Sequence, residues 1–330
     1  MPQGHIVFLK IAAMFLVMVA GWWASRRELL PISLARALSG LVVHLTFPAL
    51  VFTQMISTVS ASALRRGWWI PLFALVSIML AAAVGRVCGR FCRIEPESRR
   101  TFTFLVAIPN WVFLPLPIAM GLYGAEGVRF VLLYNFGAQI VLWTFGLWLL
   151  QGGSPGISAF KALLGNAGIW ATVGGAGLAL VWPGAARLGQ EPVGAGWWLV
   201  GDGVVSALKM IGDLTIPLSL LVTGAQLGAM TGDSFRWRPL AGVTVARLLV
   251  APALTVLLLK AVLMGIGVKL TEAEYFTAVI IVAMPVAISC TMFTERFGGD
   301  SRLSAGTIFY STLLGLVSVP GAVLASRWLY

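Results

Sequence analysis

The sequence predicts an all-α integral membrane protein with ten transmembrane helices, arranged as two inverted five-helix repeats that each contain a broken helix. Composition is the first reason: hydrophobic residues make up 59% of the 330 residues and charged residues only 11%, whereas soluble domains carry about 25% charged residues. The second is a series of ten apolar segments with short connections. The third is that prolines interrupt corresponding segments of the two halves, which predicts a break in each repeat.

Ten segments have the length of about 20 apolar residues that a helix needs to cross a bilayer. They run over residues 5–24, 33–58, 68–89, 101–123, 127–150, 159–182, 199–230, 241–264, 273–296 and 303–328. A run of Gly, Ser and Pro at 152–156 separates a first repeat, 1–151, from a second, 157–330. The first segment is expected to be a retained helix, since it lacks the basic stretch and cleavage site of a signal peptide.

The distribution of Lys and Arg predicts the orientation of these spans. The connections after spans 1, 3, 5, 7 and 9 are the richer ones, with Arg26, Arg27, Arg36, Arg86, Arg90, Arg93, Arg99, Arg100, Lys161, Arg236, Arg238, Arg296 and Arg302. The opposite side has Arg65, Arg66, Arg129, Arg187, Lys269 and Arg327. The richer side is expected to be cytoplasmic, with both termini outside the plasma membrane (the inner membrane, in a bacterium). Five spans in each half then invert one repeat relative to the other.

Charge, cysteine spacing and missing motifs argue against several classes of function. The net charge of +11 does not indicate nucleic-acid binding, because the basic residues lie in the short connections between apolar segments. Cys88, Cys92 and Cys290 do not have the spacing of a zinc site or of a disulfide framework. There is no phosphate-binding loop and no set of catalytic side chains, so we expect no enzyme, no cofactor and no metal.

The broken helices are the best indication of a binding site. Span 4 contains Pro109, Pro115 and Pro117, and span 9 contains Pro285. A proline inside a helix removes a backbone donor and clashes with the preceding turn. Breaks at matching places in two repeats are typical of carriers, whose half-helix N-termini suit an anion. The alternative is that these prolines only kink packed helices.

Five polar side chains within the spans are candidate functional residues. Asn110, inside the first break, can donate to a carboxylate or cap the break itself. Gln139 can contact substrate or bond to another helix. Lys209 and Asp213 lie four residues apart on one helical face, with Arg247 as a third partner. They form either a coupling site or a structural ion pair.

The sequence also resembles the auxin efflux carrier family over nearly its whole length. The resemblance is carried by Pro109-Asn110, Pro117-Ile118, Tyr123-Gly124, Gln139 with Trp143, Gly212-Asp213, Arg247, Met284-Pro285, Glu295-Arg296-Phe297-Gly298 and Ser304 to Phe309. It implies a scaffold of spans 1, 2, 6 and 7 and a transport domain of spans 3–5 and 8–10. Elevator-type alternating access and a homodimer through the scaffold are implied as well.

The resemblance also implies where the substrate binds. Asn110 and Gln139 would be polar contacts beside the breaks at Pro109 and Pro285. The backbone amides that follow Pro285 would receive a carboxylate, and these belong to Val286, Ala287 and Ile288. The implied substrates are small organic anions such as malate, malonate or an aromatic carboxylate.

Three hypotheses about function follow. The first is a secondary carrier of organic anions, driven by the membrane potential or coupled to protons. A potential of 100 mV is worth about 2.3 kcal/mol for each charge moved. The second is a sodium-coupled symporter of the bile-acid carrier type. The third is a membrane sensor that binds an anion without moving it.

Overall fold

The computed structural model describes residues 3–152, 164–165, 167–189, 197–229, 237–266 and 270–330. In these ranges the chain consists of helices joined by short turns, and β-structure is limited to one isolated bridge. The predicted start of the second repeat, residue 157, lies outside the described ranges. The chain divides into two compact units, each built from segments that are distant in sequence.

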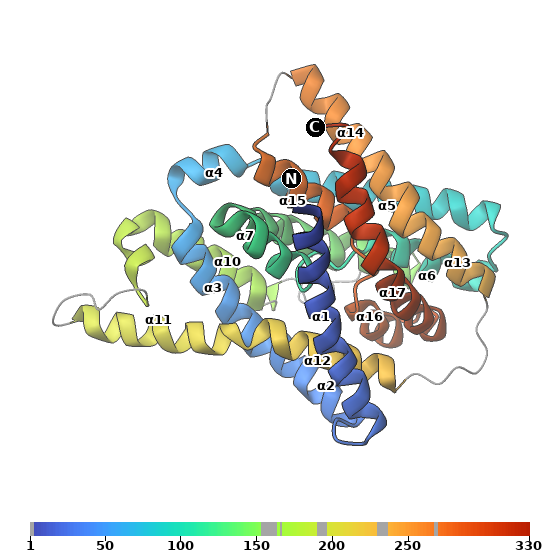
Figure 1. Cartoon of the computed structure of the whole chain (residues 1–330), viewed down its shortest axis with the longest axis horizontal. Helices are drawn as coiled ribbons and strands as arrows, with labels where there is room; N and C mark the ends of the chain where they lie inside the picture. The colour runs from blue at the N-terminus through green and yellow to red at the C-terminus, as the bar shows by residue number, and fades with distance from the viewer. Residues whose placement is uncertain (1–2, 153–163, 166, 190–196, 230–236, 267–269) are drawn as a thin grey trace. The chain divides into compact units, whose positions relative to one another are not determined.

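The smaller unit comprises residues 14–70 and 164–229. Its elements are the larger part of α1 (Gln3–Arg26), α2 (Ile32–Leu41), the π-helical turn η1 (Val42–Thr46), α3 (Phe47–Thr58), α4 (Ala61–Gly67), α10 (Ala167–Val181), η3 (Pro183–Arg187), α11 (Trp197–Asp213) and α12 (Thr215–Gly228). Helix α3 packs against α10 and α11, as Figure 1 shows. Small residues allow close packing here: Gly175 of α10 lies directly against the backbone of Phe52 in α3.

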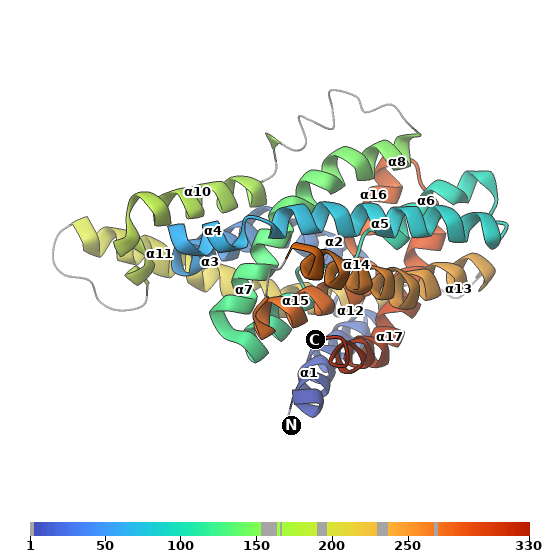
Figure 2. The same ribbon diagram turned by 90° about the horizontal axis from the view of Figure 1, so that it is seen from above.

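The larger unit comprises residues 1–13, 71–163 and 230–330. Its elements are α5 (Ile70–Phe91), α6 (Pro96–Ala107), α7 (Pro115–Val141), the π-helical turn η2 (Leu142–Gly146), α8 (Leu147–Gln151), α13 (Trp237–Val245), the π-helical turn η4 (Ala246–Val250), α14 (Ala251–Ile266), α15 (Glu272–Ala283), α16 (Ser289–Phe297) and α17 (Ser301–Ser326). Helix α15 packs against α7, α14 and α17. Figure 2 shows α14 and α15 beside one another. The most buried helices of this unit are α6 and α15.

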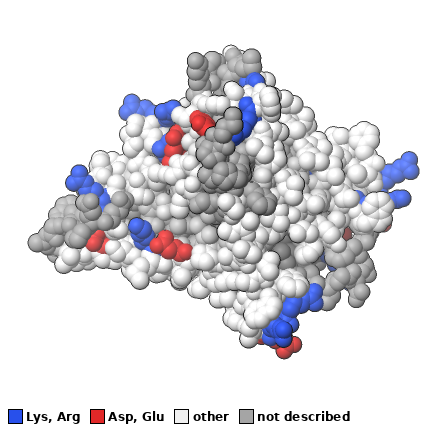
Figure 3. Space-filling model, viewed as in Figure 1, with Lys and Arg blue, Asp and Glu red and all other residues white. Residues whose placement is uncertain are grey.

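Six helical segments of the described chain are long and apolar enough to cross a membrane. They are Ile32–Thr58, Ala61–Phe91, Pro115–Gln151, Leu199–Gln226, Trp237–Val262 and Ser301–Ser326. The helix Ala167–Val181 is apolar but shorter. On the face drawn in Figure 3, uncharged residues cover most of the surface and charged ones appear in small separate groups. A multi-span helical protein is therefore what the structure shows, and the ten-span inverted repeat stays a prediction.

Side-chain caps fix where the helices next to the breaks begin. Thr271 accepts from the backbone N–H of Glu274, whose carboxylate accepts in return from the N–H of Thr271, which is a capping box. Asp300 caps α17 by accepting from the N–H of Leu303 at 2.9 Å, and its other oxygen accepts from Ser98 Oγ in α6. These caps anchor α15 and α17, and the second also joins α17 to α6.

At the predicted boundary between spans 4 and 5, two helical segments, together labelled α7, meet at a kink. Helix α7 runs from Pro115 to Val141 with a single non-helical residue, Gly124, at φ 55° and ψ −139°. Only glycine adopts this conformation without strain. The first part of α7 therefore belongs to the broken helix of span 4, and the part after Gly124 corresponds to span 5.

Candidate functional site: a crossing of two broken helices

The larger unit contains two helices that break at the predicted prolines. Helix α6 ends at Ala107 and α7 begins at Pro115, while α15 ends at Ala283 and α16 begins at Ser289. The first break is shorter than its three prolines predict. Only Pro109 lies within it, because Pro115 opens α7, where a missing N–H has no cost.

The two breaks cross and bond to each other. Pro109 and Val286 face one another in an antiparallel β-bridge. The N–H of Asn110 donates to the carbonyl of Pro285 at 2.8 Å, and the N–H of Ala287 donates to the carbonyl of Ile108 at 3.1 Å. In a membrane an interrupted backbone needs internal partners. Here each break supplies hydrogen-bond partners for backbone groups of the other.

Arg247 connects the two half-helices that end at the crossing. Its side chain is 2% exposed and comes from the π-helical turn η4. Nη1 donates to the carbonyl of Val106 at 2.9 Å, and Nη2 donates to the carbonyl of Val282. Both carbonyls lie three residues before a break proline, in the last turns of α6 and α15. A helix C-terminus carries about half a negative charge, so one guanidinium neutralises two of them.

The N-terminus of α16 has donors to spare. Of the three amides predicted to receive a carboxylate, two are already used: Val286 donates to Ser311 Oγ at 3.3 Å, and Ala287 donates to Ile108. Within the described ranges, the amides of Ile288 and the next residue, Ser289, have no acceptor. In this structure the bridge and α17 therefore engage the first two predicted amides, and the Ile288 amide is the one of the three that stays available.

Asn110 caps the first break. Its side chain is 4% exposed, and Oδ1 accepts from the backbone N–H of Phe113 at 3.2 Å. Its amide nitrogen donates to no described residue. The two roles considered from the sequence are therefore compatible, since the oxygen holds the turn and the nitrogen is available to an acceptor.

Gln139 belongs to a row of hydrogen-bonded side chains that the sequence did not reveal. Asn135 Oδ1 accepts from Trp111 Nε1 at 3.0 Å and from Gln139 Nε2 at 3.4 Å. Gln139 Oε1 accepts in turn from Trp143 Nε1 at 3.1 Å, and the Trp143 ring meets Phe293 of α16 edge-on. The missed residue is Asn135, although its position four residues before Gln139 places both on one helical face.

Asn135 also retains an unused donor. It is 1% exposed, and its Nδ2 has no partner within the described part of the chain. A buried polar group without a partner is uncommon and costs about 1–3 kcal/mol. Such a group next to the first break adds to the unpaired donors of Asn110 and α16.

The predicted grouping of Lys209, Asp213 and Arg247 is not seen in the described chain. Lys209 and Asp213 are both exposed on α11, and no ion pair within 4.0 Å connects them in the described ranges. Arg247 takes backbone carbonyls as its partners instead. The predicted pair is thus not formed in this structure, because a spacing of four residues permits contact between two flexible side chains but does not enforce it.

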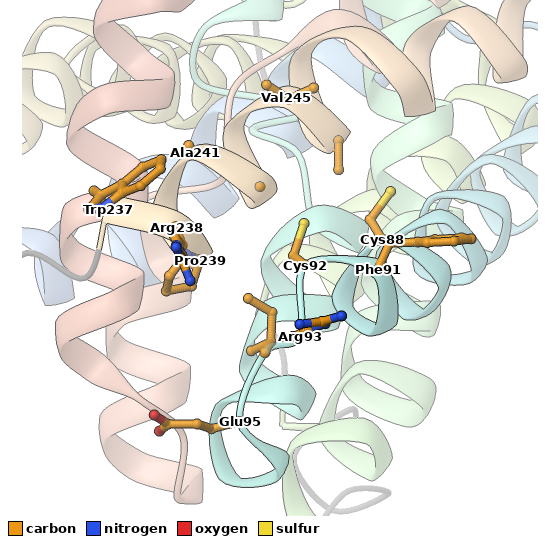
Figure 4. A pocket seen from close by; sticks show the side chains of 13 residues that line it. Cys88, Phe91, Cys92, Arg93, Glu95, Trp237, Arg238, Pro239, Ala241 and Val245 are labelled. Carbon is orange, nitrogen blue, oxygen red and sulfur yellow. The ribbon is translucent and has the colours of Figure 1, made fainter.

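A cavity of about 760 Å³ lies elsewhere in the larger unit, between the end of α5 and α13. Figure 4 shows Cys88 from α5, Cys92, Arg93 and Glu95 after it, and Arg238 from α13 around this space. The described lining includes no residue of the crossing. Among the described residues, no three His, Cys, Asp or Glu side chains are grouped to hold a metal ion.

Comparisons with known proteins identify the class of this molecule. A family model described as membrane transport protein matches residues 6–161 and 179–323. An uncharacterized transporter of Methanothermobacter thermautotrophicus is 23% identical over 295 residues, which cover 87% of each chain. Another, from Methanocaldococcus jannaschii, is 19% identical over 94% of this chain and 95% of its own. The protein PIN-LIKES 2 of Arabidopsis thaliana is 27% identical over 130 residues, 36% of this chain and 28% of its own.

The family model covers both breaks, Arg247 and the row of side chains around Asn135. Full-length relatives are transporters by name, and apolar helices of spanning length are present. This chain is a multi-pass membrane transporter and belongs to the membrane transport protein family, also called the auxin efflux carrier family.

Proposed function

We propose that this transporter is a secondary carrier of small organic anions, chiefly carboxylates, which bind at the crossing of the two broken helices. The observation that carries the proposal is the position of Arg247. It neutralises the negative ends of α6 and α15 and leaves the positive ends of α7 and α16 without an equivalent partner.

The charge balance favours one carboxylate. Each helix end carries about half an elementary charge, so the two C-terminal ends sum to roughly −1 and the guanidinium cancels them. The two N-terminal ends then leave roughly +1 at the crossing. Electrostatic attraction is strong in a medium of low dielectric constant, and the Ile288 and Ser289 amides with Asn110 Nδ2 supply hydrogen-bond donors.

Elevator-type movement is the proposed mechanism. The division into two units supports it, because the unit with the crossing contains the predicted spans 3–5 and 8–10, and the other contains most of the predicted spans 1, 2, 6 and 7. In this proposal the larger unit carries the anion across the membrane and the smaller unit stays fixed. Two inverted five-helix repeats, a homodimer through the fixed unit and a bacterial inner membrane with both termini outside complete the proposal.

The direct test is transport in liposomes. Native protein would be reconstituted, and charge movement recorded on addition of malonate, malate or indole-acetate, with and without sodium or a pH gradient. Asn110→Ala removes both the free amide donor and the oxygen that caps the first break, so its thermal midpoint would be measured beside its transport. Gln226→Ala in α12 removes an amide of the other unit as a matched control. We expect a current for at least one anion that falls at least tenfold in Asn110→Ala, about 1.4 kcal/mol, and is retained in the control.

The outcomes separate the hypotheses. A current that requires sodium would favour the sodium-coupled symporter. Absence of current together with uptake of labelled anion would indicate electroneutral exchange. Binding of an anion without uptake would leave the sensor hypothesis and overturn the carrier. A full current in Asn110→Ala would place the substrate away from the first break.

A further inference from the structure

A second anion site is indicated by a basic cavity at the ends of two spans. The cavity has a volume of about 290 Å³ and lies where α5, α6 and α8 meet. Its described lining consists of Arg86 and Arg90 from α5, Pro96, Arg99, Arg100 and Thr103 from α6, Trp148 and Leu149 from α8, and Gly152 after it. We call this lining the arginine pocket.

The spacing of the lining residues places them on one face of α5 and on one face of α6. Arg86 and Arg90 are four residues apart, and so are Arg99 and Thr103, so each pair lies on one helical face. Four arginines therefore line the same cavity. No Asp or Glu is part of the described lining, and within the described ranges no carboxylate lies within 4.0 Å of Arg86, Arg90 or Arg100.

One of the guanidinium groups is held in place by a backbone carbonyl, and another lies beside a glycine. Arg99 Nη2 donates to the carbonyl of Ile94 at 3.0 Å, whereas its Nε is buried with no acceptor in the described chain. The Arg100 guanidinium lies against Gly152, where a Cβ atom would come within 2.0 Å of Nη1. Like charges repel one another, so an anion in the cavity would stabilise this arrangement.

The chemistry and position of the pocket favour a phosphate group. Guanidinium forks bind phosphate with paired hydrogen bonds, and several cations around one cavity match an anion with several oxygens. The candidate spans Ala61–Phe91 and Pro115–Gln151 both end here, which places the pocket at the depth of lipid headgroups. Trp148 is 37% exposed beside it, as tryptophans at membrane interfaces commonly are.

We propose that the arginine pocket binds the phosphate of an anionic phospholipid headgroup. The site is separate from the crossing and does not depend on the transported substrate. Basic pockets between transmembrane helices are suited to such headgroups. A bound lipid would join α5, α6 and α8 of the same unit by neutralising the charges that otherwise repel each other.

The test compares matched variants of the full-length protein in detergent and in nanodiscs. One variant carries Arg86→Gln, Arg90→Gln and Arg100→Gln. The control carries Arg26→Gln, Arg27→Gln and Arg36→Gln, which remove the same charge from residues that are outside the pocket but on the same predicted side. Binding of phosphatidylglycerol, phosphatidylcholine and soluble glycerol phosphate would be measured by native mass spectrometry and by the thermal midpoint.

Native protein should prefer phosphatidylglycerol to phosphatidylcholine. The pocket variant should bind phosphatidylglycerol at least about tenfold more weakly, because it loses three of the four guanidinium groups that can pair with the phosphate, and the control should bind like the native protein. Equal losses in both variants, or no preference in the native protein, would overturn the proposal. Protection by glycerol phosphate equal to that by the lipid would retain the phosphate site but overturn the lipid as its source.

A variant that keeps every charge guards against a folding defect in the triple variant. The combination of Arg86→Lys, Arg90→Lys and Arg100→Lys retains the three charges but exchanges each planar guanidinium fork for a point charge. It should weaken phosphatidylglycerol binding severalfold while leaving the net charge unchanged. Binding as in the native protein would show that guanidinium forks do not hold the headgroup.

Discussion

Arg247 caps the C-terminal ends of two helices with one side chain. Its guanidinium reaches the last turns of α6 and α15 at the same time. A planar fork with several donors can bridge two carbonyls, whereas an ammonium group acts more as a point charge. The residue therefore controls both the electrostatic balance of the crossing and the relative position of two half-helices.

Replacement of Arg247 should reveal both contributions. Arg247→Leu leaves two buried carbonyls without a donor, and we expect unfolding in detergent to become easier by about 3 kcal/mol with loss of anion transport. Arg247→Lys should recover part of the stability. The exposed Arg238 serves as the control, and equal thermal midpoints for Arg247→Leu and Arg238→Leu would argue against the bridge.

Asn135 and its neighbour Tyr134 offer a comparison between a residue of the site and a structural one. Asn135→Ala removes the acceptor of Trp111 and Gln139 and should lower both stability, by about 1–3 kcal/mol, and transport. Tyr134 instead bonds to Ser77 at 2.9 Å. Tyr134→Phe should cost about 1 kcal/mol without altering anion preference. If both variants change transport alike, the row around Asn135 has no special role.

At this scale the sequence identified residue types but not their partners. Asn110 and Gln139 stand out because polar side chains are rare in apolar segments. Arg247 stood out for the same reason, yet its partners are backbone carbonyls. Every residue has one, so the residue types do not show which carbonyls Arg247 binds. Asn135 was overlooked since its bond to Trp111 depends on how the break folds back on α7.

Among the elements, close helix packing is set by small residues. Gly137 of α7 lies against the carbonyl of Pro71 at the start of α5, where a Cβ atom would come within 2.3 Å of the oxygen. A backbone so near cannot move aside as a flexible side chain can. The contact helps to fix α7, and with it Asn135 and Gln139, against α5.

Gly137→Ala should therefore destabilise the larger unit by at least about 1–3 kcal/mol, the usual cost of overpacking. Gly40→Ala in α2 is the matched control, because no atom lies within 4 Å of the added methyl group. That control should be neutral or stabilising by up to about 1 kcal/mol. Thermal unfolding of both variants in one detergent gives the comparison, and a neutral Gly137→Ala would contradict the close approach.

Element boundaries were predictable where a side chain or a proline marks them. Pro109 and Pro285 predicted the two breaks, and both helices end just before them. The change of direction at Gly124 also lies between the predicted ends of spans 4 and 5, where a glycine permits the required backbone conformation. The bridge between the breaks was not predictable at all, since it joins segments from opposite halves of the chain.

For the whole molecule, the central feature is that each unit combines parts of both halves of the sequence. The larger unit takes 71–163 from the first half and 230–330 from the second. Composition and the apolar segments predicted the membrane class, which is confirmed, whereas the ten spans stay a prediction. They carry no information on which segments pack together, and the grouping of spans came instead from family resemblance.

Elevator movement predicts which distances change when an anion binds. In protein with Cys88, Cys92 and Cys290 replaced, spin labels at Glu97 and Lys260 both lie in the larger unit, whereas labels at Glu97 and Arg27 lie in different units. A saturating anion should leave the first distance distribution unchanged and shift the second by several ångströms, as in rigid-body domain movement. Double electron–electron resonance in liposomes measures both distance distributions. A shift between Glu97 and Lys260 alone would contradict a rigid moving unit.

The bridge between Pro109 and Val286 also has a consequence for biosynthesis. Val286 leaves the ribosome more than half a chain length after Pro109. Until then the first break lies in the membrane with the carbonyl of Ile108 and the amide of Asn110 unpaired, and Arg247 has not yet reached α6. The nascent first half therefore depends on water or on the insertion machinery to shield this segment, and a half-length polypeptide has no means of completing the site by itself.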